Sequence, residues 1–475
     1  MRYDATGIRT QERRYIANVH VWMVVLVLIS IAAGVSLLLV NPMIIFGLVG
    51  IVIMVVLLLR FPYLGVLAYL LFEYANLSAM YPALQKLQFG KLIVVPTIVI
   101  WLVRKIATHN PRIPVDRIYW LFAAWLGLGL ASASMAMDPG RAFQASFDLF
   151  KWFLVTFLIV SLVDTLPKWN VAMWLVLLLN FKLSQFQIRA FAAGFASTSN
   201  KAFYIADGVG AGSTKFFANA TDFGLGMVVV MPLAFYMIFS VKSKILKIAA
   251  IVMSSAFAIS ILKSGSRGAA LALFVLVGIY WFKSKKKLVP FIFGLVFIGL
   301  FWLSAPDAWR SRFEASKDYE EGTAKQRIEL WQAGLDMFAD HPILGVGINN
   351  FAVVFDARYR TNRYVGASAP HSIFIQALAE LGLAGLVILL ATILVLLRRN
   401  WQTRKLCKEV GPEDQAIVNF SHALDLSIIG YVVGGAFLTV LYYPHLYIMA
   451  GFALALNHIA RRKALSSPEP AGVDV

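Results

Sequence analysis

The sequence predicts an all-α, polytopic integral membrane protein with about fourteen transmembrane helices. Of its 475 residues, 60% are hydrophobic and only 14% are charged, whereas a soluble globular domain has roughly 45–50% apolar and about 25% charged residues. The apolar residues form blocks of about 17–25 residues, the length that a helix needs to cross roughly 30 Å of hydrocarbon. Basic residues lie between these blocks rather than in one patch, so the net charge of +18 indicates membrane topology and not nucleic-acid binding.

The apolar blocks define the predicted spans in chain order. They lie at residues 19–40, 43–59, 61–80, 88–103, 118–137, 147–163, 169–190, 217–240, 248–263, 268–282, 288–304, 372–397, 417–440 and 444–460. We expect about eleven helices in an N-terminal bundle over residues 1–304 and the rest in a C-terminal group over residues 371–465. A polar loop over residues 305–370 separates the two groups, and residues 466–475 form a disordered tail.

The charges between the blocks predict the orientation. Every second connection is basic if the N-terminus is cytoplasmic, as the positive-inside rule demands. These connections carry Arg60, Arg104, Lys105, Arg112, Arg117, Lys168, Lys242, Lys244, Lys247, Lys283, Lys285, Lys286, Lys287, Arg398, Arg399, Arg404, Lys405, Lys408, Arg461, Arg462 and Lys463. The sequence therefore predicts a bacterial inner (cytoplasmic) membrane protein with both termini in the cytoplasm and the loop 305–370 in the periplasm.

The periplasmic loop contains a helical pattern from Thr323 to Ala339. Its expected apolar stripe consists of Ile328, Trp331, Leu335 and Phe338. We expect this amphipathic helix to lie on the bilayer and to end before Pro342, which cannot continue a helix. A glycine-rich turn follows at residues 344–351.

Ionisable residues within the apolar spans are concentrated at the predicted outer ends. They are Arg141, Asp148, Lys151, Lys182, Arg189, Lys215, Asp222, Lys263 and Arg267. Such residues cost about 2.5–3.5 kcal/mol on insertion scales and usually line a cavity or pair with one another. A cluster of cations at this depth suits a lipid-linked diphosphate, because Arg and Lys donate to phosphate oxygens. Internal ion pairing, such as Asp148 with Lys151, is the alternative.

Two further segments could bind phosphate. Small residues around Arg267 let the backbone bend tightly at residues 263–269, so that Arg267 faces the mouth of a cavity, unless it only extends to the lipid head groups. Arg327 and Trp331 are four residues apart and share one helix face. Arg327 could therefore face a phosphate or, alternatively, pair with Glu329 in solvent.

His371 stands where the polar loop re-enters the membrane, after Pro370. A neutral imidazole there could accept a proton from a hydroxyl group, although a polar anchor is the simpler interpretation. Glu380 lies deeper in the same helix and could serve helix packing. We expect no metal site, because His341, His371 and His445 are irregularly spaced without a supporting carboxylate pattern. Residues 345–347 are no nucleotide loop, since no strand precedes them.

Four motifs in one order resemble the O-antigen ligase/O-antigen polymerase superfamily of membrane glycan transferases. Residues 265–269 resemble its SRG motif, and Arg327 with Trp331 resembles its RxxxW helix. Residues 341–351 resemble its hPlxGxGxxxF loop, and residues 371–386 resemble its signature helix. Ser372 replaces the usual Asn, and the His-Ser pair together with residues 218–224 is closer to the exopolysaccharide or exosortase-associated O-glycosylation members.

The resemblance implies transfer of a glycan from an undecaprenyl-diphosphate-linked donor to a hydroxyl of a glycan, lipid or protein acceptor. It implies inversion at the anomeric carbon and no metal, nucleotide or other cofactor. Arg267 and Arg327 would hold the diphosphate, and His371 would orient or deprotonate the acceptor. Lys215, Lys263, Arg189, Arg141, Trp331 and Asp222 are the expected substrate-binding residues.

Three functions remain open from the sequence. A ligase and a polymerase that joins lipid-linked repeat units share this chemistry, and the ligase is favoured. A flippase or other transporter of lipid-linked oligosaccharides is the alternative from another class. Transporters are expected to show inverted repeats and charges near the bilayer midplane, whereas here the charges crowd one side beneath a long loop.

Overall fold

The computed structural model describes residues 42–75, 89–108, 116–192, 220–283, 299, 323–360, 369–407 and 411–466. Within these residues every regular element is helical, which confirms the predicted all-α class. Outside the described residues lie the predicted block at residues 19–40, the block at residues 288–304 apart from residue 299, Lys215 and most of the predicted tail.

Each predicted block within the described residues overlaps a helix, although the bounds differ by several residues for the blocks at residues 118–137 and 147–163. These helices are α2 (Pro42–Arg60), α3 (Tyr63–Ala75), α6 (Phe89–Ala107), α7 (Ile118–Ser132), α8 (Pro139–Leu162), α9 (Leu166–Ala192), α10 (Ala220–Ser240), α11 (Lys244–Lys263), α12 (Arg267–Lys283), α17 (Ile373–Leu406), α18 (Pro412–Gly435) and α19 (Pro444–Ser466). Six helices among the described residues are long and apolar enough to cross a membrane, namely α8, α9, α10, α11, α17 and α18. The chain is therefore a membrane protein, while the larger number of spans stays a prediction.

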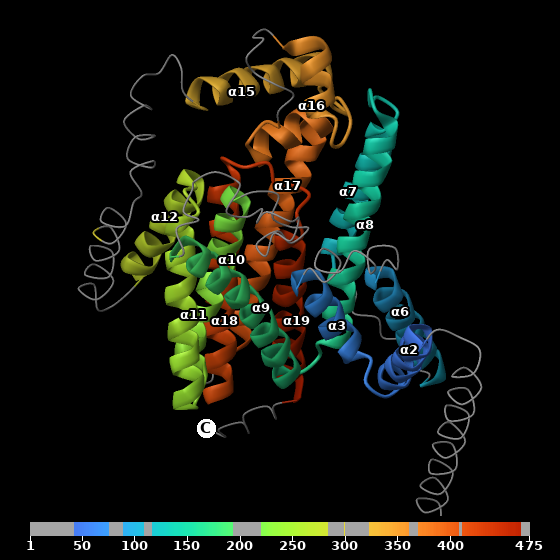
Figure 1. The fold of residues 1–475 in the computed structure, drawn as a ribbon, viewed down its shortest axis with the longest axis vertical. Helices are drawn as coiled ribbons and strands as arrows, with labels where there is room; N and C mark the ends of the chain where they lie inside the picture. Colours follow the sequence, from blue (N-terminus) through green and yellow to red (C-terminus); the bar gives the residue numbers. More distant parts are fainter. Residues whose placement is uncertain are drawn as a thin grey trace, which may run out of the picture.

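The bundle is built around α19, which α8, α9, α17 and α18 surround (Figure 1). Almost every side chain from Leu446 to Leu456 is buried, as expected for a helix that is apolar on all sides. Two hydrogen bonds tie neighbouring helices to the backbone of α19 in this core. The Trp169 indole donates to the Phe452 carbonyl at 3.0 Å, and the Thr156 hydroxyl donates to the Tyr447 carbonyl at 2.8 Å.

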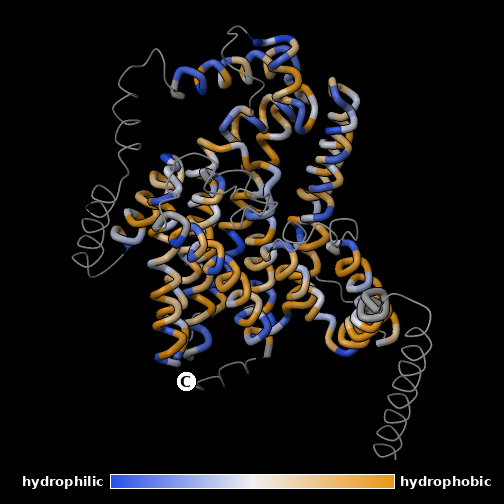
Figure 2. The backbone as a smooth tube through the Cα atoms, viewed as in Figure 1, coloured by the Kyte–Doolittle hydropathy of each residue, from blue (hydrophilic) through white to orange (hydrophobic). Residues whose placement is uncertain are grey.

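A short helical layer crosses the end of the bundle where α17 begins (Figure 1). It consists of α15 (Thr323–Asp340), α16 (Phe351–Val354) and η2 (Phe355–Tyr359). Hydrophilic residues are frequent in α15, in contrast to the apolar bundle helices (Figure 2). The end of α15 at Asp340 confirms the stop that Pro342 predicts.

The expected apolar stripe of α15 is wrong in part. The buried positions are Leu330, Ala333 and Met337, whereas the side chain of Leu335 is 48% exposed. α15 packs on the first turns of α17 and on α16 instead of facing only the bilayer, and these neighbours select the buried face. Gly334 permits this approach, because a Cβ there would collide with the side chain of Ile375.

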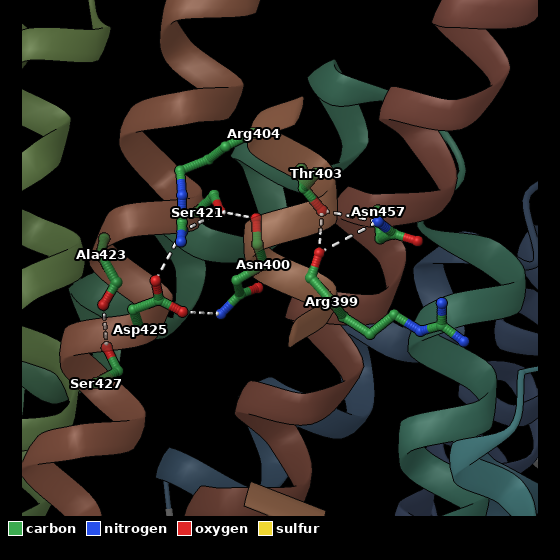
Figure 3. A network of polar contacts seen from close by, with 9 residues as sticks. All are labelled: Arg399, Asn400, Thr403, Arg404, Ser421, Ala423, Asp425, Ser427 and Asn457. Carbon is green, nitrogen blue, oxygen red and sulfur yellow. Dashed lines mark hydrogen bonds and ion pairs between the residues drawn. The ribbon is translucent and has the colours of Figure 1, made fainter. Parts of the chain in front are cut away.

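A polar network fastens α17, α18 and α19 together at the opposite end of the bundle (Figure 3). The Arg404 guanidinium contacts the Asp425 carboxylate at 2.7 Å, and the Asn400 amide donates to its other oxygen at 2.9 Å. The Asn457 amide of α19 donates to the Thr403 hydroxyl at 2.9 Å. These bonds fix the three helices relative to one another where buried polar groups must be satisfied.

Candidate active site

α17 is broken at Gly382, where φ is 65° and ψ is −164°. A Cβ at this position would lie 2.5 Å from the Ile343 carbonyl oxygen, so that only glycine fits. Beyond the break, the Leu383 amide donates to the Pro342 carbonyl at 2.9 Å instead of to its own helix.

The glycine-rich turn fills this break. The Val346 amide donates to the Ala379 carbonyl at 2.9 Å, and the Gly347 amide donates to the Glu380 carbonyl at 3.1 Å. Irregular backbone at membrane depth is tolerated only where protein groups satisfy it. The loop motif at residues 341–351 and the helix motif at residues 371–386 therefore form one structural unit.

The buried carboxylate of Glu380 binds this unit together. It accepts hydrogen bonds from the Asn349 amide at 3.0 Å, the Phe351 amide at 3.3 Å and the Gln376 side chain at 3.3 Å. It also accepts from the Tyr442 hydroxyl at 2.6 Å, which extends the network to the connection between α18 and α19. Since its side chain is only 2% exposed, Glu380 acts as a positioning residue beneath the site.

His371 lies immediately before α17 in a left-handed backbone conformation, with φ of 50°. This conformation is uncommon for a residue other than glycine and persists only where neighbouring groups hold it. The His371 amide donates to the Thr439 hydroxyl at 2.9 Å, and Ser372 caps α17 through its hydroxyl. The backbone that carries the imidazole is therefore fixed by the connection between α18 and α19.

Arg327 lies on α15, one turn before Trp331. The Trp331 indole donates to the carbonyl of Pro370 at 2.9 Å, and its ring lies 6.4 Å from that of Phe437. These contacts place the face of α15 that carries Arg327 over the residue that precedes His371. The predicted pairing of Arg327 with Glu329 is not among the ion pairs of the described residues.

Arg267 is the exposed first residue of α12. The Ser266 hydroxyl accepts from the Ala269 amide at 3.2 Å and so caps this helix. A positive side chain is unfavourable at a helix N-terminus, where the macrodipole and the free amides attract anions. The position of Arg267 therefore suits an anion that binds both the guanidinium and the end of the helix.

Electrostatic interactions join Arg267, Arg327 and His371. Burial and then the positive charge of Arg267 lower the pKa of Arg327. Burial and then the charge of Arg327 lower the pKa of His371, which favours its neutral imidazole. Two cations that repel each other beside a neutral imidazole form a site where a bound anion would offset the repulsion.

Among the other candidate residues, Trp331 reaches this group through the carbonyl of Pro370, whereas the ion pair of Arg141 lies elsewhere. Arg141 is exposed and pairs with Asp138 at 3.4 Å, at the start of α8. Arg189 is exposed on α9, and Lys263 is half-buried at the end of α11. Asp222 is buried and accepts a hydrogen bond from the Tyr443 hydroxyl at 2.8 Å. 

The alternative of internal pairing is confirmed for Asp148 and Lys151, which form an ion pair. This pair therefore belongs to the local structure of α8.

Sequence reasoning missed the connection between α18 and α19 as part of the site. Thr439, Tyr442 and Tyr443 contact His371, Glu380 and Asp222, respectively. The available signal was a short hydroxyl-bearing turn between two apolar blocks, at the same predicted end of the bundle as Pro370 and His371. Hydroxyl groups in such a turn can bond to neighbouring buried backbone and carboxylate groups.

Comparison with known families matches residues 252–390 to the O-antigen ligase family. This segment contains all four motifs, and the resemblance to the O-antigen ligase superfamily is thereby confirmed. The match indicates a membrane enzyme of the glycan ligase or polymerase type, acting on a lipid-linked glycan and an acceptor. The chain matches none of the curated proteins.

Proposed function

Because the site lies in the segment that matches the O-antigen ligase family, we propose that the chain is a ligase for lipid-linked glycans. It transfers a glycan from an undecaprenyl diphosphate donor to an acceptor hydroxyl in the periplasm, without a metal. The observation that carries this proposal is the contact between α15 and the start of α17: the Trp331 indole, one turn after Arg327, donates to the carbonyl of Pro370, which directly precedes His371. 

The two arginines serve the leaving group in this proposal. As the bond between the anomeric carbon and the diphosphate oxygen breaks, negative charge builds up on the diphosphate. Arg267 and Arg327 donate charge-assisted hydrogen bonds to it, and the free amides at the start of α12 add to this stabilisation. Donors aimed at developing charge supply much of a rate enhancement in many enzymes, so neither a metal nor a general acid is required.

His371 serves the acceptor in this proposal. Its neutral imidazole takes the proton as the acceptor oxygen forms the new bond to the anomeric carbon, and the imidazolium later releases that proton to water. The lowered pKa of His371 keeps the base form available at physiological pH. Attack opposite the leaving diphosphate inverts the anomeric centre. Lys263, Arg189, Arg141, Asp222, Lys215 and Trp331 remain candidates for contacts with the rest of the donor or acceptor.

The proposed orientation places this site in the periplasm, at the outer leaflet of the bacterial inner membrane. It requires about fourteen spans with both termini in the cytoplasm. Basic connections at the other end of the bundle, such as those that hold Arg117, Arg398 and Arg461, support this orientation.

A polymerase that joins repeat units would use the same residues and differs only in its acceptor. A flippase is less well supported. Discontinuous helices in transporters commonly leave backbone groups free to bind a substrate or ion. In this protein the break at Gly382 is occupied by the turn at residues 342–347, whose backbone groups bond to those of α17.

The test is transfer by the purified full chain in detergent, with an undecaprenyl diphosphate glycan and candidate acceptors, and without nucleotide or metal. A single addition to lipid A-core or another acceptor supports the ligase, whereas a ladder of repeats supports the polymerase. We expect His371→Ala and Arg327→Ala to lose activity, while the exposed loop variant Arg358→Ala retains it. Wild-type rates in both site variants would overturn the assignment of the site.

A further inference from the structure

A cavity of about 540 Å³ lies at the other end of the bundle, between the start of α7 and the ends of α17 and α19. It is lined by Arg117, Arg398, Arg399, Arg461, Trp120 and Asp116, among others. It is remote from the candidate active site, because His371 precedes the first residue of α17 and Arg398 lies near its last turns. The proposed function assigns no role to it.

The charges in this cavity are not balanced. Arg399 contacts the Asp116 carboxylate at 2.9 Å and donates to the Gln402 side chain at 2.8 Å. Asp116 is the one carboxylate among the described residues that line the cavity. It neutralises Arg399, so that Arg117, Arg398 and Arg461 give the cavity an excess of positive charge.

The walls of the cavity are held in place. The carbonyl of Arg399 accepts from the Thr403 hydroxyl at 2.9 Å and from the Asn457 amide at 3.3 Å, while its side chain extends away from the polar network (Figure 3). The Asp116 carboxylate also accepts from the Ile118 amide at 3.1 Å, at the first residue of α7. The part of the wall formed by Arg399 and Asp116 is therefore fixed, and a preorganised wall lowers the entropic cost of binding a ligand.

The sequence pattern predicts that the cavity lies at the boundary between hydrocarbon and head groups. Arg117 directly precedes an apolar block, and Arg398 and Arg461 directly follow two others. Trp120 is 76% exposed, as tryptophan often is at a membrane–water interface. Leu394, one turn before Arg398, is 65% exposed and offers an apolar surface directly beside the cations. The positive-inside rule explains each arginine separately, but not their convergence with an exposed Trp.

We propose that this cavity binds the head group of an anionic phospholipid from the cytoplasmic leaflet. Phosphodiester oxygens accept from Arg117, Arg398 and Arg461, and the acyl chains lie along Trp120 and Leu394. Basic pockets between transmembrane helices on the cytoplasmic side bind such head groups in other proteins. A soluble phosphate ester would satisfy the guanidinium groups but leave the adjoining apolar surface unused. The leaflet follows from the proposed orientation, whereas the site itself does not depend on the catalytic roles.

Binding is tested by native mass spectrometry of the full chain in detergent. The ligands are phosphatidylglycerol, phosphatidylethanolamine and soluble glycerol 3-phosphate. We expect saturable binding of phosphatidylglycerol with a clear preference over the other two. The double variant Arg398→Gln/Arg461→Gln should weaken it about 30-fold, from roughly 1 kcal/mol for each lost charge. The matched variant Arg60→Gln/Arg104→Gln removes two exposed cations of the same predicted face outside the cavity and should bind normally.

Three results would overturn the proposal. These are equal losses in the two double variants, equal affinity for the zwitterionic lipid, and binding of glycerol 3-phosphate as tight as that of phosphatidylglycerol. Arg398→Lys/Arg461→Lys keeps the positive charges without the planar guanidinium groups and should bind phosphatidylglycerol with intermediate affinity. This variant separates loss of the binding site from loss of the fold. The glycan transfer rate of these variants tests the proposed function separately. If they all transfer glycan at the wild-type rate, the proposed function stands whether or not the cavity binds lipid.

Discussion

The two ends of the bundle both carry arginines on helix ends, but their surroundings differ. At the end that carries the polar network, Arg404 contacts Asp425 at 2.7 Å and Arg399 contacts Asp116 at 2.9 Å. At the end that carries the candidate active site, the charge that acts on Arg327 is another arginine, and the pKa of Arg327 is lowered by burial and by Arg267. A buried cation with a carboxylate partner is part of the framework. A half-buried cation beside another cation is a site that favours an anion.

The largest expected effect concerns the framework at the end of the bundle opposite the candidate active site. Asp425→Ala leaves Arg404 without its carboxylate in a place where the two side chains are 19% and 10% exposed. Removing one partner of a buried pair costs about 3–5 kcal/mol. We expect a corresponding loss in the free energy of unfolding, measured by denaturation in detergent, with normal activity per folded molecule. Arg404→Leu/Asp425→Leu should recover most of the stability, and a wild-type unfolding curve for Asp425→Ala would contradict the comparison.

Arg327→Ala should do the opposite, affecting catalysis and not the fold. Loss of one donor to developing charge typically lowers kcat by about 10²–10³-fold. The thermal unfolding temperature should change little, because removal of Arg327 also relieves its repulsion with Arg267. Arg358→Ala, an exposed arginine near the same loop, is the control in the transfer assay. If the Arg327→Ala variant unfolded at a lower temperature than the wild type but transferred glycan at the wild-type rate, Arg327 would belong to the framework instead.

A smaller effect is expected at Thr439, whose hydroxyl accepts a hydrogen bond from the His371 amide. Thr439→Val removes an acceptor worth about 0.5–1.5 kcal/mol. If the left-handed backbone of His371 must be held for catalysis, kcat should fall about 2- to 10-fold at constant KM. Thr439→Ser keeps the hydroxyl and should retain activity. Equal losses in the two variants would indicate a packing role for Thr439 instead.

The smallest effect is a shift in pH dependence. Burial and Arg327 lower the pKa of His371, so transfer should fall only where acid protonates the imidazole, below the ordinary histidine range. Arg327→Gln removes one of the two causes and should raise the pKa of His371. The acid limb of kcat/KM, which reports the free enzyme, should then move to higher pH in the residual activity. If the acid limb of kcat/KM did not move in Arg327→Gln, or moved equally in Arg358→Gln, the result would argue against His371 as the base.

The sequence by itself determined the helices and the identity of the candidate groups. Blocks of apolar residues specify helices locally, and Pro342 ends α15 because proline lacks an amide donor and clashes with the preceding turn. The motifs around Arg267, Arg327 and His371 also follow from local sequence, and they fall within the segment that matches the O-antigen ligase family.

Only the tertiary structure decided which of these groups meet. Arg141 and Arg189 have the charge and depth expected of the site, yet the structure does not join them to it. Thr439 and Tyr442 contact the site from 68 and 62 residues away, and no local pattern encodes such contacts. The break at Gly382 could not be predicted from the sequence of α17 alone, because it depends on the turn that fills it. The backbone groups that the break frees must form hydrogen bonds with a distant segment. Periodicity is a local property of the chain, whereas a site depends on long-range packing.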